Sequence, residues 1–506
     1  MDTGNNELFL RLWQEVDIHK TTVLNNCGFW VPYNKGGSFR KWYGNNFYLV
    51  NWSNDGETLS NFKGSNIRNR SYHFKEGITW STTSGSAFAG RKSPTGYLFD
   101  SKGCMAFSYG GISLEKLLAQ MNAVTFNSFL DIITPTLDFN PGPVGNVPIE
   151  EVNNNVSEEL VIENISASKD DWDSFENSWD FKKHPLLRNI STISEAFAQW
   201  QAECDDRFNK LKANEEELNH IFIDIYGLQD ELTPEVEDKD VTVRKADLQR
   251  DIKSLLSYAV GCMFGRYSLD VEGLAYAGGE WDSSKYQSYI PDADNVIPIT
   301  DEEYLDDDIV SRLCAWLKVV YGADTLEANL DYIAKALGNK GSTSREIIRN
   351  YFLNDFFKDH CQTYSVTGSG KRPIYWLFDS GKQNGFKALV YLHRYTPDTI
   401  GNLRIDYLHK MQRVYESEIN RMQDMMDHSE NAREVAAASK RKDKLAKQLK
   451  ECREYDEKIS HLALSRIELD LDDGVKVNYR KLQTAQDGKF YEVLADSKNI
   501  MVKEKK

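Results

Sequence analysis

The chain has 506 residues, of which 41% are hydrophobic and 27% charged, a composition typical of globular proteins and long enough for about three domains. Its formal net charge of -16 argues against nucleic-acid binding over the whole surface, although a whole-chain value hides local charge. No apolar run approaches the roughly 20 residues that span a bilayer, and the N-terminal "MDTGNNELFLRLW" lacks the pattern of a signal peptide. The seven cysteines are widely spaced and contain no CxxC, which predicts a cytoplasmic protein with reduced, mostly buried thiols.

Residues 20–110 are typical of a β-rich region. The segments "FYLVNW", "GITWSTT" and "TGYLFDS" are short apolar or alternating runs, separated by the turn sequences "KGGS", "SNDGE" and "SPTG". Residues 114–130 have the apolar spacing of one helix. Residues 134–149 hold several prolines and glycines and predict an extended segment.

The remainder of the chain is predicted to be mostly helical. Residues 151–185 are acidic and polar, so we expect a linker there. Helices are expected at about 186–226, 243–266, 306–321, 326–338 and 344–357, and strands or short elements at 372–380 and 386–395. Residues 398–465 carry two apolar seams with "DHSENARE" between them, which predicts an antiparallel helical hairpin.

The predicted fold class is therefore α+β: a β-rich N-terminal domain, then a mostly α-helical region with a small α/β part and a long helical hairpin. The expected division is 1–150 for the β-rich domain, 151–185 for the acidic linker, 186–340 for a helical domain, 341–400 for a small α/β segment, 401–468 for the hairpin and 469–506 for a C-terminal tail.

Residues 20–110 also combine positive charge with aromatic rings. Eleven Lys and Arg stand against four Asp and Glu, a local charge of about +7, and the same stretch holds about 18 aromatic residues. Lys and Arg bind phosphates, whereas Arg and Asn read guanine and adenine edges. The candidate DNA-binding residues are Lys35, Arg40, Lys41, Asn45, Asn46, Arg68, Arg70, Arg91 and Lys92.

Within this set, a strand through residues 40–42 would place Arg40 and Trp42 on one face and Lys41 on the other. Arg40 would then be the better candidate for a base contact, because its guanidinium can bond guanine twice. The same composition also fits an aromatic-rich β-domain whose rings form the core and whose charges form a solvated rim.

Catalytic and metal-binding motifs are not found. "VTGSGKRP" (366–373) departs from the phosphate-loop pattern, because Arg372 and Pro373 follow the lysine. The nine histidines show no metal-ligand spacing. We therefore assign no catalytic, cofactor-binding or metal residue in this chain.

Two groups of segments resemble known families. Residues 30–57, 72–103 and 134–149 resemble the target-recognition domain of TaqI-like and Type IIG-like adenine-specific DNA methyltransferases. Residues 254–270, 370–412 and 469–483 resemble the C-terminal region of the PglX family, the methyltransferases of BREX phage-defence systems.

The resemblance implies that residues 1–150 recognise double-stranded DNA for a larger adenine-specific methyltransferase. Such an enzyme has a Gly-rich motif that binds S-adenosylmethionine and an Asn-Pro-Pro-Tyr loop that receives the flipped adenine. Neither motif occurs here. The chain is thus expected to be inactive alone, with the catalytic domain as a partner and other BREX proteins as further partners. An alternative is an interaction scaffold that docks defence-system proteins through its acidic helices and hairpin. An independent hydrolase or nuclease is a weaker one.

Overall fold

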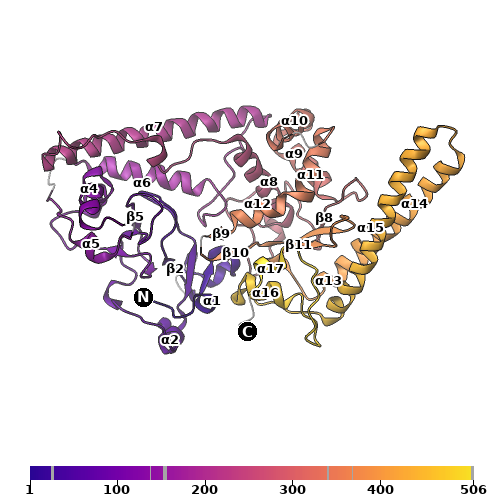
Figure 1. The fold of residues 1–506 in the computed structure, drawn as a ribbon, viewed down its shortest axis with the longest axis horizontal. Helices are drawn as coiled ribbons and strands as arrows, with labels where there is room; N and C mark the ends of the chain where they lie inside the picture. The colour runs from indigo at the N-terminus through magenta and orange to yellow at the C-terminus, as the bar shows by residue number, and fades with distance from the viewer. Residues whose placement is uncertain (24–27, 137, 152–155, 339–340, 367, 503–506) are drawn as a thin grey trace. The chain divides into compact units, whose positions relative to one another are not determined.

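The computed structural model describes residues 1–23, 28–136, 138–151, 156–338, 341–366 and 368–502 (Figure 1). The chain forms two compact units. The first unit combines Met1–Leu186 with Ala196–Asp247, and the second combines Leu187–Glu195 with Leu248–Lys506. Short sheets and many helices occur in both units, which confirms the α+β fold class.

The first unit contains two small sheets. The first sheet has the order β1 (Leu10–Leu12), β3 (Tyr48–Asn51), β2 (Trp30–Asn34) and β6 (Leu98–Phe99), and the second has the order β5 (Gly90–Ser93), β4 (Gly77–Trp80) and β7 (Met105–Ala106). Neighbouring strands are antiparallel except β2 and β6. The strands expected from "FYLVNW", "GITWSTT" and "TGYLFDS" are confirmed as β3, β4 and β6, since each has a local apolar pattern bounded by turns.

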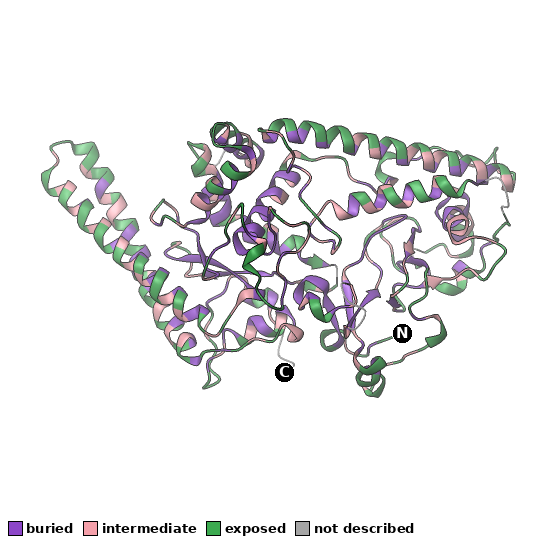
Figure 2. Ribbon diagram, turned by 180° about the vertical axis from the view of Figure 1, so that it is seen from behind, coloured by how far each residue is buried: buried purple, intermediate pink, exposed green. Residues whose placement is uncertain are grey.

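The helices of this unit are α1 (Asn6–Phe9), α2 (Ser53–Asn61), α3 (Leu114–Asn122), α4 (Val124–Ile133), α5 (Pro141–Gly145), α6 (Glu158–Asp173) and α7 (Ile193–Tyr226), of which α7 belongs to this unit from Ala196 on. Residues of α3 to α7 share a core with the second sheet. Trp42, Ile78 and Trp80 share one apolar core with Leu118 of α3 and Phe222 of α7. Figures 1 and 2 both show α6 and α7 side by side, and Asn214 of α7 donates to Asn164 of α6 at 2.9 Å.

Several sequence expectations in this unit were wrong. Residues 134–149 were expected to be extended, but Pro141–Gly145 form the short helix α5. Residues 114–130 form two helices, not one, because Asn219 of α7 accepts the N–H of Val124 at 2.9 Å and caps a new helix after Ala123. Residues 151–185 were expected to be a linker, but they hold α6. Most of its acidic residues are exposed or partly exposed, but Asp171 is buried together with Val161, Ser168 and Trp172.

The second unit surrounds a buried helix and a three-stranded sheet. Its sheet has the order β11 (Tyr375–Asp379), β12 (Lys387–Tyr391) and β8 (Ile297–Pro298), and β9 (Ser365–Val366) pairs with β10 (Gly370–Lys371). Its helices are α8 (Leu248–Phe264), α9 (Ile309–Tyr321), α10 (Leu326–Leu337), α11 (Ser344–Asn354), α12 (Phe356–Thr363), α13 (Thr399–Asn402), α14 (His409–His428), α15 (Ala432–Ser465), α16 (Val475–Lys481) and α17 (Ser497–Ile500). No described helix is both long enough and apolar enough to cross a membrane.

The predicted helical hairpin is confirmed as α14 and α15. The chain reverses at residues 429–431, within the expected turn, and the Asn431 side chain accepts the N–H of Arg433 at the start of α15. Tyr415 on α14 and Leu445 on α15 are buried in the seam. Figure 2 shows the outward faces of the hairpin as exposed.

One carboxylate of the hairpin holds the turn between β11 and β12. Glu451 accepts hydrogen bonds from Ser380 Oγ at 2.8 Å, from the Gln383 N–H at 2.9 Å and from the Gly385 N–H at 3.0 Å. Three hydrogen-bond donors of the turn are thereby satisfied by one side chain of α15.

We predict that Glu451→Ala lowers the free energy of unfolding of the second unit by about 2 kcal/mol, because three donors to a charged acceptor lose their partner. Urea unfolding measures this loss. Glu454→Ala is the matched control on the same helix, since Glu454 is exposed and makes only a 3.8 Å contact with Lys450. Equal stability of both variants would show that Glu451 does not hold the turn.

Candidate nucleic-acid interface

Arg40 lies inside the first unit. Its guanidinium donates to Asp171 Oδ2 at 2.8 Å and to the Ser168 carbonyl at 2.9 Å, both on α6. It also donates to the carbonyls of Tyr43 at 2.7 Å and Thr242 at 3.2 Å. With only 7% of its surface exposed, Arg40 binds other parts of its own unit.

Lys41 and Trp42 share one carboxylate on α7. The Lys41 ammonium forms an ion pair with Glu215, and Trp42 Nε1 donates to Glu215 Oε1 at 2.7 Å. The expectation that residues 40–42 form a strand with alternating faces was wrong, because Trp42 has a left-handed φ of 70°. This turn directs the side chains of both Lys41 and Trp42 to Glu215.

Arg91 and the two asparagines of this region are also buried. Arg91 is 2% exposed, and it donates to the Arg40 carbonyl at 3.2 Å and to Ser81 Oγ at 3.4 Å. Burial, together with the charge of Arg40, lowers the pKa of Arg91 to about 10. Asn45 donates to the Ser38 carbonyl at 2.9 Å, and Asn46 is 9% exposed. In this structure none of these three side chains is placed to meet a ligand outside the protein.

Two further candidates are partly exposed and ion-paired. Lys35 pairs with Asp100 at 2.7 Å. Lys92 pairs with Glu115 at 2.6 Å and Glu76 at 3.0 Å. Burial lowers the pKa of Lys92, but the two carboxylates outweigh it and raise the pKa overall.

Arg68 and Arg70 are exposed, and they lie in a basic segment that the sequence only partly indicated. Residues 58–75 contain no Asp or Glu. We define the basic rim as the four exposed cations of this segment: Lys63, Arg68, Arg70 and Lys75. The predicted set omitted Lys63 and Lys75, and the acid-free run was the signal that could have found them.

Aromatic rings accompany the basic rim. Arg70 lies over the Trp52 ring at 5.5 Å and pairs with Asp55 at 3.2 Å. Lys75 lies over the Tyr72 ring at 5.7 Å, and Tyr72 contacts the 72%-exposed Tyr109 edge to face. The rim therefore presents cations and flat rings together.

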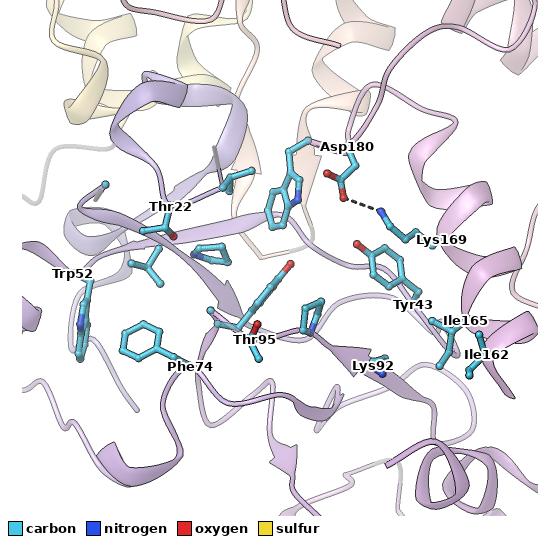
Figure 3. Close-up of a pocket in the computed structure, with 18 of the residues that line it drawn as sticks. Thr22, Tyr43, Trp52, Phe74, Lys92, Thr95, Ile162, Ile165, Lys169 and Asp180 are labelled. Atoms are coloured by element: carbon cyan, nitrogen blue, oxygen red, sulfur yellow. Dashed lines mark hydrogen bonds and ion pairs between the residues drawn. The ribbon is translucent and has the colours of Figure 1, made fainter. Parts of the chain in front are cut away.

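A groove of about 1030 Å³ opens beside the basic rim (Figure 3). Trp52 and Phe74 line one part of it, with ring centroids 6.2 Å apart, and Tyr97 and Trp179 form a second pair at 6.2 Å. We call this feature the aromatic groove, and its full lining is Thr22, Val23, Gly28, Val31, Pro32, Tyr43, Trp52, Asp55, Phe74, Lys92, Pro94, Thr95, Gly96, Tyr97, Ile162, Ile165, Lys169, Trp179 and Asp180.

Cations at the groove are neutralised by neighbours. Lys169 lies over the Tyr43 ring at 5.0 Å and pairs with Asp180 at 2.8 Å and with Asp173. Burial raises the pKa of Tyr43 to about 12, so this phenol stays protonated at neutral pH. Among the described residues, no three His, Cys, Asp or Glu side chains group as a metal site would require.

The chain is similar in sequence to two known adenine-specific methyltransferases. It is 48% identical over 505 residues to the adenine-specific methyltransferase PglX of Lacticaseibacillus casei (strain Zhang), covering 96% of this chain and 42% of the relative. It is 36% identical over 532 residues to the adenine-specific methyltransferase BrxX of Escherichia coli O9:H4 (strain HS), covering 99% of this chain and 43% of the relative. The chain thus spans about two fifths of the length of these relatives. No protein-family model matches it.

These comparisons support the resemblance to PglX in its coarser form. Nearly the whole chain, and not only the segments that carried the resemblance, is similar to adenine-specific methyltransferases. The likeness of the N-terminal region to a TaqI-like recognition domain stays a prediction.

We predict that Asp171→Asn lowers the free energy of unfolding of the first unit by about 3–5 kcal/mol at pH 7, because it leaves buried Arg40 without its carboxylate. Burial raises the pKa of Asp171, but Arg244 and Arg40 outweigh it and hold the pKa below its usual 3.8. The stabilisation is therefore fully present above about pH 4 and decreases as the pH falls further.

Denaturant unfolding between pH 7 and pH 3 measures this effect. The exposed neighbour Asp170 gives the matched control, and Asp170→Asn should leave stability nearly unchanged. A stability difference that stayed constant down to pH 3 would contradict the role of the ionised Asp171.

Proposed function

We propose that this chain is the DNA-recognition and C-terminal region of a BREX-type, adenine-specific DNA methyltransferase, and that its first unit binds duplex DNA. The basic rim is the observation that carries the proposal, since four exposed cations lie in a segment without any acid, in a chain whose net charge is -16. Its similarity to PglX and BrxX supplies the enzyme class.

The rim suits phosphate binding for a physical reason. Lys63 and Lys75 act as mobile point charges, whereas the guanidinium groups of Arg68 and Arg70 can also bond a base edge. Arg68 Nε donates to the exposed Asn66 side chain at 3.0 Å, so water and ligand reach both groups. Among the predicted DNA-binding residues, Arg68 and Arg70 carry this proposal, whereas the partly exposed Lys35 and Lys92 are paired with carboxylates.

S-adenosylmethionine does not fit the residues described here. Its usual site follows a parallel strand, with a Gly-rich turn and an acid for the ribose. In the described part of the chain, the named strands pair antiparallel except β2 with β6, and β6 has only two residues. We therefore place the cofactor and the methyl transfer in a catalytic domain outside these 506 residues, which we propose as the partner of this chain, in the cytoplasm and together with other BREX proteins.

The hairpin gives no specific support for the alternative of a protein-docking scaffold. Protein interfaces usually centre on large apolar side chains. On α14 and α15, all of which is described, Leu464 is the exposed large hydrophobic residue, and it lies at the end of α15.

We predict that Arg68→Ala and Arg70→Ala each weaken binding to a short duplex, and that each flattens the dependence of log K on log salt by about 1. Fluorescence anisotropy across a salt series measures both quantities. If either arginine reads a base, its variant also loses preference for the matched sequence.

The control for this experiment is Lys239→Ala. Lys239 belongs to the same unit, its side chain is 71% exposed, and it pairs only with the equally exposed Glu237. Unchanged affinity and slope in both arginine variants would overturn the basic rim as the DNA contact.

A second prediction concerns catalysis. The chain alone should transfer no methyl group from labelled S-adenosylmethionine to DNA, because the cofactor and extruded-base sites lie elsewhere in this proposal. Adenine methylation by the purified 506-residue chain would contradict it.

A further inference from the structure

The aromatic groove needs an explanation that the basic rim does not give. Its two cations, Lys92 and Lys169, each pair with two carboxylates. Asp55, on the opposite part of the lining, is paired with Arg70 of the rim. The groove walls therefore carry no excess positive charge, and they do not form a channel for phosphates.

Aromatic rings lie on both sides of the groove. Figure 3 shows Trp52 and Phe74 at one side and Tyr43 beside Lys169 at the other. Phe74 is 39% exposed, so its ring offers a free face, whereas Trp52 is 7% exposed and supports it. A cavity of about 1030 Å³ is at the upper end of the range for small-ligand sites. Flat, uncharged ligands suit such walls.

Phe74 also has a backbone conformation that favours glycine. Its φ is +64°, and two backbone hydrogen bonds of 3.0 Å, one with Tyr97 and one with Gly96, hold it there. A bulky residue in the left-handed region is strained. Because the ring is 39% exposed, its burial does not fully offset the cost of this backbone strain. We infer that the strained conformation is kept because it holds the ring in the groove.

Hydrogen-bond acceptors complete the groove. The carboxylates of Asp55 and Asp180 line it, and their side chains are 79% and 47% exposed. Carboxylates in nucleic-acid interfaces accept hydrogen bonds from exocyclic amino groups. The groove thus offers stacking faces and amino-group acceptors, with the phosphate-binding rim at its edge through Asp55 and Arg70.

We propose that the aromatic groove receives an amino-bearing nucleobase that has left the duplex stack, while the basic rim holds the flanking phosphates. This proposal rests on the proposed DNA binding of the first unit. It adds a base-binding site in that unit, separate from the site where methyl transfer takes place.

The test compares three duplexes of one sequence: fully paired, with one unpaired cytosine bulge, and with one abasic bulge. The chain should bind the cytosine bulge roughly 5- to 150-fold more tightly than the abasic bulge, the range expected for stacking one base. The abasic duplex controls for the flexibility that any bulge gives. A thymine bulge, which lacks the amino group, should bind more weakly than the cytosine bulge.

Phe74→Gly is the decisive variant. It should remain folded, because glycine adopts φ +64° without strain, and it should lose most of the preference for the cytosine bulge. The control is Ile132→Ala, which removes an exposed apolar side chain of α4 outside both the groove lining and the basic rim, and which should leave the ratio between the two bulged duplexes unchanged.

The outcomes separate the two proposals. Weak, salt-independent binding of all three duplexes would overturn DNA binding by the first unit as a whole. Salt-dependent binding with equal affinity for the cytosine and abasic bulges would overturn the base site alone, as would a Phe74→Gly variant that keeps the full preference. The groove would then be a site for another apolar ligand, such as a peptide.

Discussion

Two buried carboxylates determine the arrangement of the first unit. Asp171 on α6 binds Arg40 and Arg244, and Glu215 on α7 binds Lys41 and Trp42. Each carboxylate is at most 4% exposed, so the cost of desolvating the charges is large unless every partner is present. The loop at residues 35–46, the two helices and the second sheet therefore depend on one another, and this network fixes which cations remain free for a ligand.

This network also explains which parts of the candidate site could be predicted. Lys41 and Glu215 are 174 residues apart in the chain, and Arg40 and Asp171 are 131 apart. Local composition shows a cluster of cations, but it cannot show that distant acids neutralise them. Arg68 and Arg70 were predicted from the same local composition, and they remain exposed in the fold.

The same distinction applies to the fold. The hairpin and the strands β3 and β4 follow from periodicity within a few residues, and the structure has them close to the expected positions. The break after Ala123 depends on Asn219, about 95 residues away, and α6 was hidden because its acidic outer face dominates its composition. The aromatic groove joins residues 22–97 to residues 162–180, so no local pattern could reveal it.

The separation of buried and exposed cations has a consequence for how such a region can change. Residues 63–75 make mostly surface contacts, so substitutions there change the exposed surface of the first unit without disturbing the ion pairs of Asp171 or Glu215. The loop at 35–46 is the opposite case, since each charge change there needs a compensating change on α6 or α7. Exchanging residues 63–75 between relatives is therefore the simplest route to a chimera with an altered surface and an intact scaffold.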